Sequence, residues 1–322
     1  MLLYLFISLL LIAAILIYFK IAGRYAIVDK PNRRSSHSHI TIRGGGIIFP
    51  LAAVLWFVFY DFGDRWAIAG LLLIAAISFL DDLRPLSGKV RMVVHFAAVS
   101  LLFYNEGIFG LSWYWLVIGY MLAIYWINAF NFMDGINAIT PFYSLVALAA
   151  FWFLNLEVHF FSQDLILILV ISALIFSFFN ARRRALTFAG DVGSVSMAFL
   201  LSWMMLSLIH HSAHFEYILL FAVYGLDSVF TIIFRLLRHE NIFQAHRSHL
   251  YQLLSNERKQ PHVRVALYFA LTQLLIDAGV ILMICKGWMK NVTVFIGIVI
   301  VLSAVYLYLR YRVNLLIRKP AV

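Results

Sequence analysis

Long apolar runs separated by short polar segments dominate the chain. Runs such as Leu2–Phe19 and Leu165–Phe179 contain no charged residue. A transmembrane helix needs about 20 mainly apolar residues, with a range of about 17–25. A transmembrane β-barrel would instead show alternating segments of about ten residues. The pattern therefore predicts an all-α, polytopic integral membrane protein.

We predict about eleven transmembrane helices in this chain. They cover residues 2–19, 44–60, 66–80, 91–104, 113–130, 140–156, 164–180, 193–210, 215–235, 263–285 and 291–309. The second and third are short and could instead form one re-entrant pair. No internal repeat is obvious, so residues 1–322 are expected to form a single domain.

Composition supports this prediction. Hydrophobic residues make up 64% of the chain and charged residues 12%. A soluble domain is about half apolar and about one quarter charged. A soluble fold of this length could not bury so much apolar surface, so the lipid bilayer is the expected solvent for most of the chain. Helices satisfy their backbone hydrogen bonds internally, as the bilayer core requires.

The net charge of +10 has an explanation in topology. Excess Lys and Arg in a membrane protein collects on the cytoplasmic side and near anionic lipid head groups. With the N-terminus outside, 22 of the 25 Lys and Arg residues fall on inner stretches and three fall outside. We therefore expect a cytoplasmic C-terminus, and no nucleic acid among the partners.

Two adjacent carboxylates, Asp81 and Asp82, close the third predicted span. They could be a simple polar stop at a helix end. However, adjacent carboxylates repel each other and are poor neighbours for anionic lipids. A bound divalent cation, or a proton held by one of them, would relieve that repulsion.

A second polar group follows the fifth predicted span. Asn128, Asn131, Asp134 and Asn137 recur every three residues, which on a helix would place them along one slowly drifting face. A helix-end cap with a turn at Gly135 would account for one or two of them, but not for four. Polar groups at the membrane boundary are functional candidates.

The segment Gly190–Ser194 directly precedes the eighth span, and two interpretations stay open for it. Asp191 or Ser194 could be the N-cap of the helix. Alternatively, Asp191 is a metal ligand, and Gly193 lets a phosphate approach the helix N-terminus.

A fourth group contains His246, Arg247 and His249. A zinc site would need a third ligand, and the sequence has no His-Glu-x-x-His motif and no cysteine cluster. An anion-binding or acid–base function suits this set better. The first inner segment, 32–46, ends in Gly44–Gly46, which could simply permit close helix packing.

Carboxylates, amides, guanidinium groups and imidazoles thus gather on one side of the membrane. Carboxylates bind phosphate through Mg²⁺, which prefers oxygen ligands and neutralises a transferring phosphoryl group. The placement suggests a nucleotide-activated donor from the cytosol and a lipid phosphate acceptor from the membrane.

These four motifs, in this order, resemble the polyprenyl-phosphate N-acetylhexosamine-1-phosphate transferase superfamily, which includes the WecA-type enzymes and phospho-MurNAc-pentapeptide translocase. The resemblance runs from about Asp29 to Gln252. The segment 33–46 and the run 246–252 look most like the WbpL-type branch, which initiates O-antigen synthesis.

The resemblance implies a reaction in which a UDP-N-acetylhexosamine and undecaprenyl phosphate give undecaprenyl-diphosphate-sugar and UMP. It implies Mg²⁺ as cofactor, with Mn²⁺ as a substitute, and the inner membrane of a bacterial cell with a cytoplasmic active site. A homodimer is compatible with it. The donor stays open among UDP-GlcNAc, UDP-GalNAc and 6-deoxy forms such as UDP-FucNAc or UDP-QuiNAc.

The resemblance also assigns roles by motif position. Asp191 would bind Mg²⁺, and Asp81 or Asp82 would act as base or support the metal. The remaining residues of the implied site are Asp134, grouped with the catalytic carboxylates, and Asn128, Asn131, Asn137, Arg91, His246, Arg247 and His249, which would bind substrate.

Three departures from the family pattern bear on the substrate. His95 replaces a usual Gln, and Ile40 and Ile42 stand where relatives often have prolines. Asn137 stands where the translocase has Asp, which argues against that enzyme and its pentapeptide substrate.

The alternative function is a cation- or proton-coupled transporter, which would need ionisable residues at the bilayer midplane and often inverted repeats. Asp227 and Asp277 are the candidates for it. An intramembrane protease fits less well, since Phe188 stands where the aspartyl type needs Gly.

Overall fold

The computed structural model describes residues 2–31, 36, 39–242, 244, 246–289 and 291–318. Residues 32–35, 37 and 38 of the first inner segment lie outside the described residues, as do Lys290 and Lys319 of the charge count.

Each of the eleven predicted spans corresponds to a helix, which confirms the all-α class. The helices are α1 (Leu2–Arg24), α2 (Ile48–Phe59), α3 (Arg65–Leu83), α4 (Gly88–Asn105), α5 (Trp113–Met133), α6 (Ile139–Val158), α7 (Gln163–Asn180), α8 (Gly190–Ser212), α9 (Ala222–Leu237), α11 (His262–Cys285) and α12 (Val292–Arg318). The short α10 (Leu250–Gln252), the 3₁₀ turns Gly45–Ile47, Ile108–Gly110 and Phe215–Phe221, and a π-helical turn at Leu253–Glu257 complete the list.

Within the described ranges, nine helical segments are long and apolar enough to cross a membrane. The 3₁₀ turn before α2 and α2 itself form a shorter apolar helix, Gly45–Phe59. α2 and α3 are separate helices, since α2 packs on α7 and α3 packs on α4 and α8. The number of membrane crossings stays a prediction at α2 and α4.

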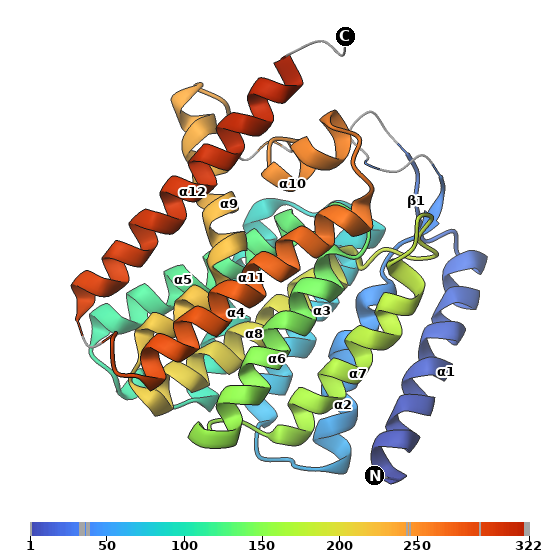
Figure 1. The fold of residues 1–322 in the computed structure, drawn as a ribbon. Helices are drawn as coiled ribbons and strands as arrows, with labels where there is room; N and C mark the ends of the chain where they lie inside the picture. The colour runs from blue at the N-terminus through green and yellow to red at the C-terminus, as the bar shows by residue number, and fades with distance from the viewer. Residues whose placement is uncertain are drawn as a thin grey trace.

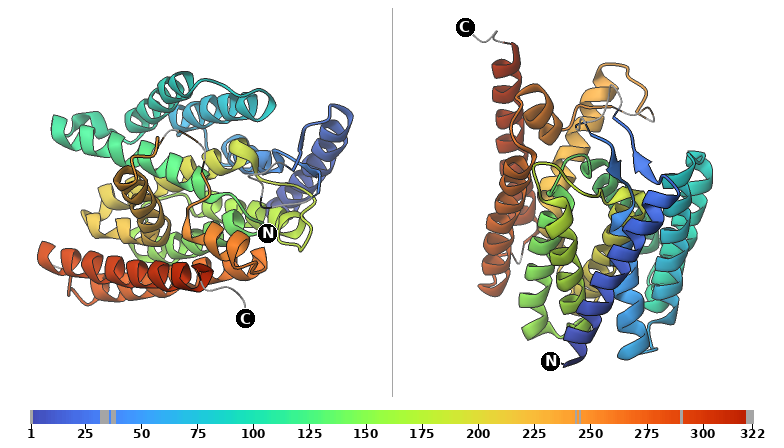
Figure 2. Two further views of the ribbon diagram at one scale, coloured as in Figure 1. Left: turned by 90° about the horizontal axis from the view of Figure 1, so that it is seen from above. Right: turned by 90° about the vertical axis from the view of Figure 1, so that its right-hand side faces the viewer.

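The helices run side by side in one bundle, with the two chain ends at opposite ends of it (Figure 1). α8 lies at the centre, because it contacts α2, α3, α5 and α6. Its sequence explains this position: it is apolar all round, and its Gly, Ala and Ser residues let neighbouring helices approach closely. α12 lies at the edge of the bundle in both views of Figure 2.

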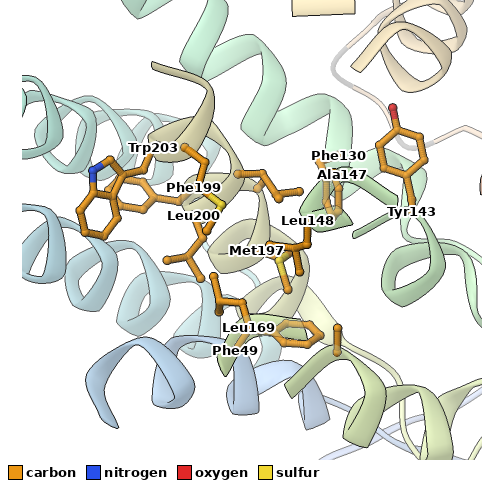
Figure 3. Close-up of a cluster of buried hydrophobic side chains, with 14 of the residues drawn as sticks. Phe49, Phe130, Tyr143, Ala147, Leu148, Leu169, Met197, Phe199, Leu200 and Trp203 are labelled. Carbon is orange, nitrogen blue, oxygen red and sulfur yellow. The ribbon is translucent and has the colours of Figure 1, made fainter. Parts of the chain in front are cut away.

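Large side chains from five helices fill the core around α8. Phe199, Leu200 and Trp203 of α8 are fully buried or nearly so, and side chains of α2, α5, α6 and α7 belong to the same cluster (Figure 3). Phe49 packs edge-on against Phe176, with ring centroids 5.2 Å apart. This packing holds the helix ends in a fixed arrangement.

The loops that carry the predicted motifs meet at the end of the bundle where the C-terminus lies (Figures 1 and 2). A two-stranded antiparallel sheet, which the sequence did not predict, lies at this end. It pairs β1 (Val28–Asp29) with β2 (Thr41–Ile42), and Ile42 also bridges to Thr187. The sheet therefore ties the first inner segment to the loop before α8.

The polar run that follows the fifth predicted span is only partly helical. The run from Asn128 to Asn137 does not form one continuous helix, because α5 ends at Met133. Ala138 adopts a left-handed conformation (φ 71°), and its N–H donates to the side chain of Asn180 at 2.7 Å. A hydrogen bond to the last residue of α7 thus fixes the turn that follows Met133.

Candidate active site

The N-terminus of α8 is capped by a residue of another helix. The N–H of Asp191 donates to Asp82 Oδ1 at 2.9 Å, and the N–H of Val192 donates to Asp82 Oδ2 at 3.0 Å. The first N–H groups of a helix lack partners within it and attract negative charge. The predicted N-cap at Asp191 or Ser194 is therefore wrong, since the capping carboxylate comes from the end of α3.

Glycines make this close approach possible. Gly190 has a positive φ of 70°, and a Cβ there would lie 2.5 Å from Asp82 Oδ2. A Cβ on Gly193 would lie 2.6 Å from the Cα of Gly46. Gly193 therefore serves backbone packing, while its role in phosphate approach stays a prediction. The packing role considered for Gly44–Gly46 is confirmed.

Arg43 bridges two of the carboxylates, and the sequence analysis did not single it out. Its Nε lies 2.6 Å from Asp82 Oδ1, and its Nη2 lies 3.5 Å from Asp191 Oδ1. Burial acts to lower the pKa of Arg43, but Asp82 and Asp191 outweigh it and raise that pKa above its usual value. In the sequence, Arg43 is one of many Arg residues in inner segments. Its place directly before Gly44 is the feature that could have marked it as a site residue.

Arg91 completes the arrangement, as the motif order implied. Its Nη1 lies 2.9 Å from Asp81 Oδ2 and 3.6 Å from Asp191 Oδ2. Asp81 Oδ1 accepts the N–H of Leu86 at 2.6 Å. We call Asp81, Asp82 and Asp191 with Arg43 and Arg91 the carboxylate cluster. Three carboxylates and two guanidinium groups leave it with a formal negative charge.

Polar residues at and after the end of α5 lie near the carboxylate cluster. Ser194 Oγ donates to Asn131 Oδ1 at 2.6 Å, which links the end of α5 to the start of α8. Thr140 donates to Asp134. Burial raises the pKa of the Asp134 carboxyl to about 6, although the Thr140 hydrogen bond acts to lower it.

A polar cavity of about 370 Å³ lies between these groups. Asn131, Asp134, Asn137 and Asp191 line it, so four of the predicted residues meet there. The other lining residues are Asp29, Ser36, Arg43, Gly135, Ile136, Asn180, Phe188, Gly190, Gln252 and His262. The cavity thus draws on five separate stretches of the chain, and no local pattern in the sequence links Asn180 or His262 to the motifs.

The remaining predicted residues do not line this cavity. Asp81, Asp82 and Arg91 lie behind Asp191 in the carboxylate cluster. Asn128 donates to the carbonyl of Ile124 in its own helix at 2.8 Å. Their proposed contacts with substrate stay predictions.

The histidine segment, which we define as His246–His249, packs beside the cavity. His249 is only 2% exposed, and its ring stacks on Tyr251 with centroids 5.8 Å apart. Burial, with the nearby His249 and Arg235, lowers the pKa of His246 to about 4, so this ring is neutral at pH 7. Direct contact of His246, Arg247 and His249 with substrate stays a prediction, while Gln252 is the neighbouring residue that reaches the cavity.

The donor set at the cavity suits a hard cation. Among the residues described, no three His, Cys, Asp or Glu side chains converge in a metal-binding arrangement. Mg²⁺, however, is commonly held by one or two carboxylates together with substrate phosphates. Asp191 and Asn131 provide oxygen atoms on the cavity wall, so they fit such an ion.

The two carboxylates considered for a transporter have fixed partners. Asp277 accepts a hydrogen bond of 2.6 Å from Gln273. Gln273 also bonds to Leu219 and Val223, where the 3₁₀ turn passes into α9. Asp227 lies in a network with α12 that is described below. Both are therefore embedded in packed helix contacts rather than in the polar cavity.

The chain is similar to one known protein family and to several known transferases. The model of a protein family described as "Glycosyl transferase family 4" matches residues 65–209. A probable undecaprenyl-phosphate N-acetylglucosaminyl 1-phosphate transferase of Bacillus subtilis (strain 168) is 26% identical over 306 residues, covering 87% of this chain and 84% of that protein. These findings confirm the resemblance to the polyprenyl-phosphate N-acetylhexosamine-1-phosphate transferase superfamily.

Two further proteins are similar to this chain over most of their length. Both are named undecaprenyl-phosphate alpha-N-acetylglucosaminyl 1-phosphate transferase. The protein of Escherichia coli (strain K12) is 27% identical over 335 residues, covering 94% of this chain and 88% of that protein. The Yersinia pestis protein is 25% identical over 298 residues, covering 84% and 81%.

The matched family region contains the carboxylate cluster except Arg43. It begins with α3 and ends within α8, so it includes Asp81, Asp82, Asp134 and Asp191. The histidine segment lies beyond it.

Proposed function

We propose that this protein transfers N-acetylhexosamine-1-phosphate from a UDP-sugar to undecaprenyl phosphate, and releases UMP. The observation that carries the proposal is the polar cavity at one end of the helical bundle, walled by Asp191 and by the segment Asn131–Asn137. A cavity at the ends of membrane-spanning helices would let a water-soluble donor and the phosphate of a membrane lipid reach the same carboxylate. The names of the similar proteins support the proposal.

In this reaction an oxygen of the lipid phosphate attacks the phosphorus atom that carries the sugar. The bond between this phosphorus and the bridging oxygen of the diphosphate breaks, and UMP leaves with that oxygen. Charge spreads over the transferring phosphoryl group, so catalysis consists mainly of positioning and electrostatic stabilisation. A Mg²⁺ ion held by Asp191 and Asn131 would supply charge neutralisation for the diphosphate.

The residues of the carboxylate cluster take different roles in this scheme. The Asp191 side chain is 21% exposed and faces the cavity, whereas Asp82 is 0% exposed. Asp82 is therefore a positioning residue, which orients the start of α8 and with it Asp191. Asp81 is 11% exposed, which favours it over Asp82 as the group that accepts a proton from the lipid phosphate.

Asp134 and Asn137 line the same cavity as Asp191, and we assign them to the nucleotide. Arg43 and Arg91 would contribute positive charge to the phosphates. We further propose that the cavity faces the cytoplasm of a bacterial cell, across the inner membrane. The positive charge at this end of the bundle supports that orientation. The product would begin an O-antigen or a related surface polysaccharide.

The decisive assay is UMP release by membranes that contain the protein, with undecaprenyl phosphate and a panel of UDP-HexNAc donors that includes 6-deoxy forms. Asp191→Asn should abolish release. Asp164→Asn is the matched control, because Asp164 lies in the first turn of α7 and bonds to Tyr4 at the opposite end of the bundle. Absence of UMP release with every donor would overturn the proposal.

A further inference from the structure

A buried polar network joins the last helix to the rest of the protein. α12 is the most exposed of the long helices, since only 6% of the residues in its most apolar stretch are buried. Among the described side chains of α12, the buried ones are Tyr306 and Arg310, which are 8% and 4% exposed. Both carry polar groups and lie one helical turn apart, whereas Phe295, Ile298 and Leu302 nearer the start of α12 make apolar contacts.

These two residues meet one face of α9. Tyr306 donates to Asp227 Oδ1 at 2.7 Å. Arg310 donates to the hydroxyls of Tyr306 at 2.6 Å and Thr231 at 2.9 Å, and its guanidinium lies 4.7 Å from the ring centre of Phe234. Positions 227, 231 and 234 share a helix face. Ionisable groups buried in a membrane protein are costly, and they are functional candidates when they are found.

The network also holds the histidine segment from both sides. The N–H of Leu250 donates to both oxygens of Asp227, at 3.0 and 3.2 Å. Arg310 Nη2 donates to the carbonyl of Ser248 at 2.8 Å. The peptide groups before and after His249 are thus fixed to α9 and α12. We call Asp227, Tyr306 and Arg310 the α12 clamp.

The clamped segment leads directly to the cavity wall. The N–H of His249 donates to the side chain of Gln252 at 3.2 Å, and Gln252 lines the cavity. Tyr251 donates to the carbonyl of Phe132 at 2.9 Å, next to Asn131. A displacement of residues 248–250 would therefore shift Gln252 and loosen Tyr251 from the end of α5.

We propose that the α12 clamp consists of positioning residues that hold the histidine segment and Gln252 in place for the sugar nucleotide. The link from the α12 clamp to the sugar nucleotide rests on the proposed function. The clamp explains why a helix with so few buried side chains carries a buried guanidinium. It predicts that loosening α12 affects binding of the donor but not of the lipid acceptor.

The test uses two variants of the full-length protein, Tyr306→Phe and Arg310→Gln. α12 offers matched controls, since Tyr308 and Arg312 form the same pair one turn apart on its exposed side, with a bond of 2.7 Å. Tyr308→Phe and Arg312→Gln therefore remove the same groups outside the clamp. Tyr306→Phe deletes a single hydroxyl, so it serves if Arg310→Gln does not fold.

The first measurement is the rate of tryptic cleavage after Arg247 in detergent, relative to cleavage after the exposed Arg238. Cleavage of a transiently open segment follows the population of the open form. Loss of a buried hydrogen bond to a charged group should raise this rate about tenfold in both clamp variants. The two controls should stay at the wild-type rate. Cleavage at the wild-type rate in both clamp variants would overturn the clamp.

The second measurement is the pair of KM values in the UMP-release assay. The clamp variants should raise the KM for the UDP-sugar about tenfold and leave the KM for undecaprenyl phosphate unchanged. An equal change in both constants, or a fall in kcat alone, would overturn the link to donor binding. If the wild-type protein releases no UMP, the proposed function fails, while cleavage after Arg247 still decides the clamp.

Discussion

Asp82 and Asp81 are neighbours in sequence but stand in different environments. The Asp82 carboxylate accepts two N–H groups of α8 and contacts Arg43, and it is fully buried. Asp81 accepts the N–H of Leu86 and contacts Arg91 in a partly exposed position. One residue therefore supports the fold of the site, and the other is available for chemistry.

Asparagine substitutions should separate these two roles. Asp82→Asn places an amide N–H₂ against an N–H donor of α8, so it should cost about 1–3 kcal/mol of stability in addition to activity. Asp81→Asn should abolish UMP release with a smaller loss of stability. Thermal unfolding in detergent, measured beside the activity assay, checks both. Equal loss of stability in the two variants would contradict the assignment.

Asp134 should give the stability of the protein a measurable pH dependence. Burial raises the pKa of its carboxyl from 3.8 to about 6. Between these values the unfolded chain releases a proton that the folded protein retains. Stability should therefore fall as pH rises from about 4 to about 6, and stay level above that range.

Asp134→Asn should remove this part of the decline, as seen in melting temperatures recorded across that range. Thr140→Val deletes the hydrogen bond that lowers the pKa of Asp134, so the decline should extend to higher pH. An identical profile for wild type and Asp134→Asn would refute this assignment.

At the scale of elements, the close contact between the start of α8 and the segment before α2 shapes the site. It sets the position of Arg43 relative to Asp191, because Arg43 directly precedes Gly44–Gly46. Small residues at such crossings let backbones approach each other. The site therefore depends on backbone separation as much as on its polar side chains.

Gly193→Ala tests this contact. The added methyl group would lie 2.6 Å from the Cα of Gly46, so the two backbones must separate. Overpacking of this kind costs about 1–3 kcal/mol, and the shift of Asp191 should reduce UMP release. Gly279→Ala on α11 is the control, since a Cβ there meets no atom within 4 Å. It should leave activity unchanged and should not lower the melting temperature, because Ala favours the helix over Gly.

At the scale of the whole molecule, the arginine-rich loops, the polar cavity and the C-terminus share one end of the bundle. The start of α1 and the end of α11, which is Cys285, lie at the other end (Figure 1). The positive-inside rule then predicts that the cavity opens to the cytoplasm.

The single cysteine allows a direct test of this orientation. Cys285 is exposed at the end of α11. A membrane-impermeant maleimide should label it in intact spheroplasts. In a Cys285→Ser background, Arg183→Cys should be labelled only after the membrane is permeabilised. The reverse pattern would show that the orientation is wrong.

Much of the candidate site could be predicted from the sequence, because its motifs stand at the ends of apolar runs. Asp191, Asn131, Asp134 and Asn137 do meet at one cavity. Arg43 and His262 could not be predicted in the same way. Each lies far in the chain from the motifs at 131–137 and 191, and only the fold brings it to the cavity. The turn after Met133 could not be predicted in detail for a similar reason, since Asn180 at the end of α7 accepts the N–H of Ala138.

The sequence by itself determined the class of fold, and it predicts the side of the membrane on which the chemistry lies. Long apolar runs must form helices, because the bilayer offers no partner for free backbone groups, and this requirement is local. The tertiary structure decided which carboxylate is buried, which arginine joins it and what the histidine segment contacts. Those outcomes depend on close approach between residues far apart in the chain, such as Asp82 and Asp191, and a linear pattern does not encode such distances.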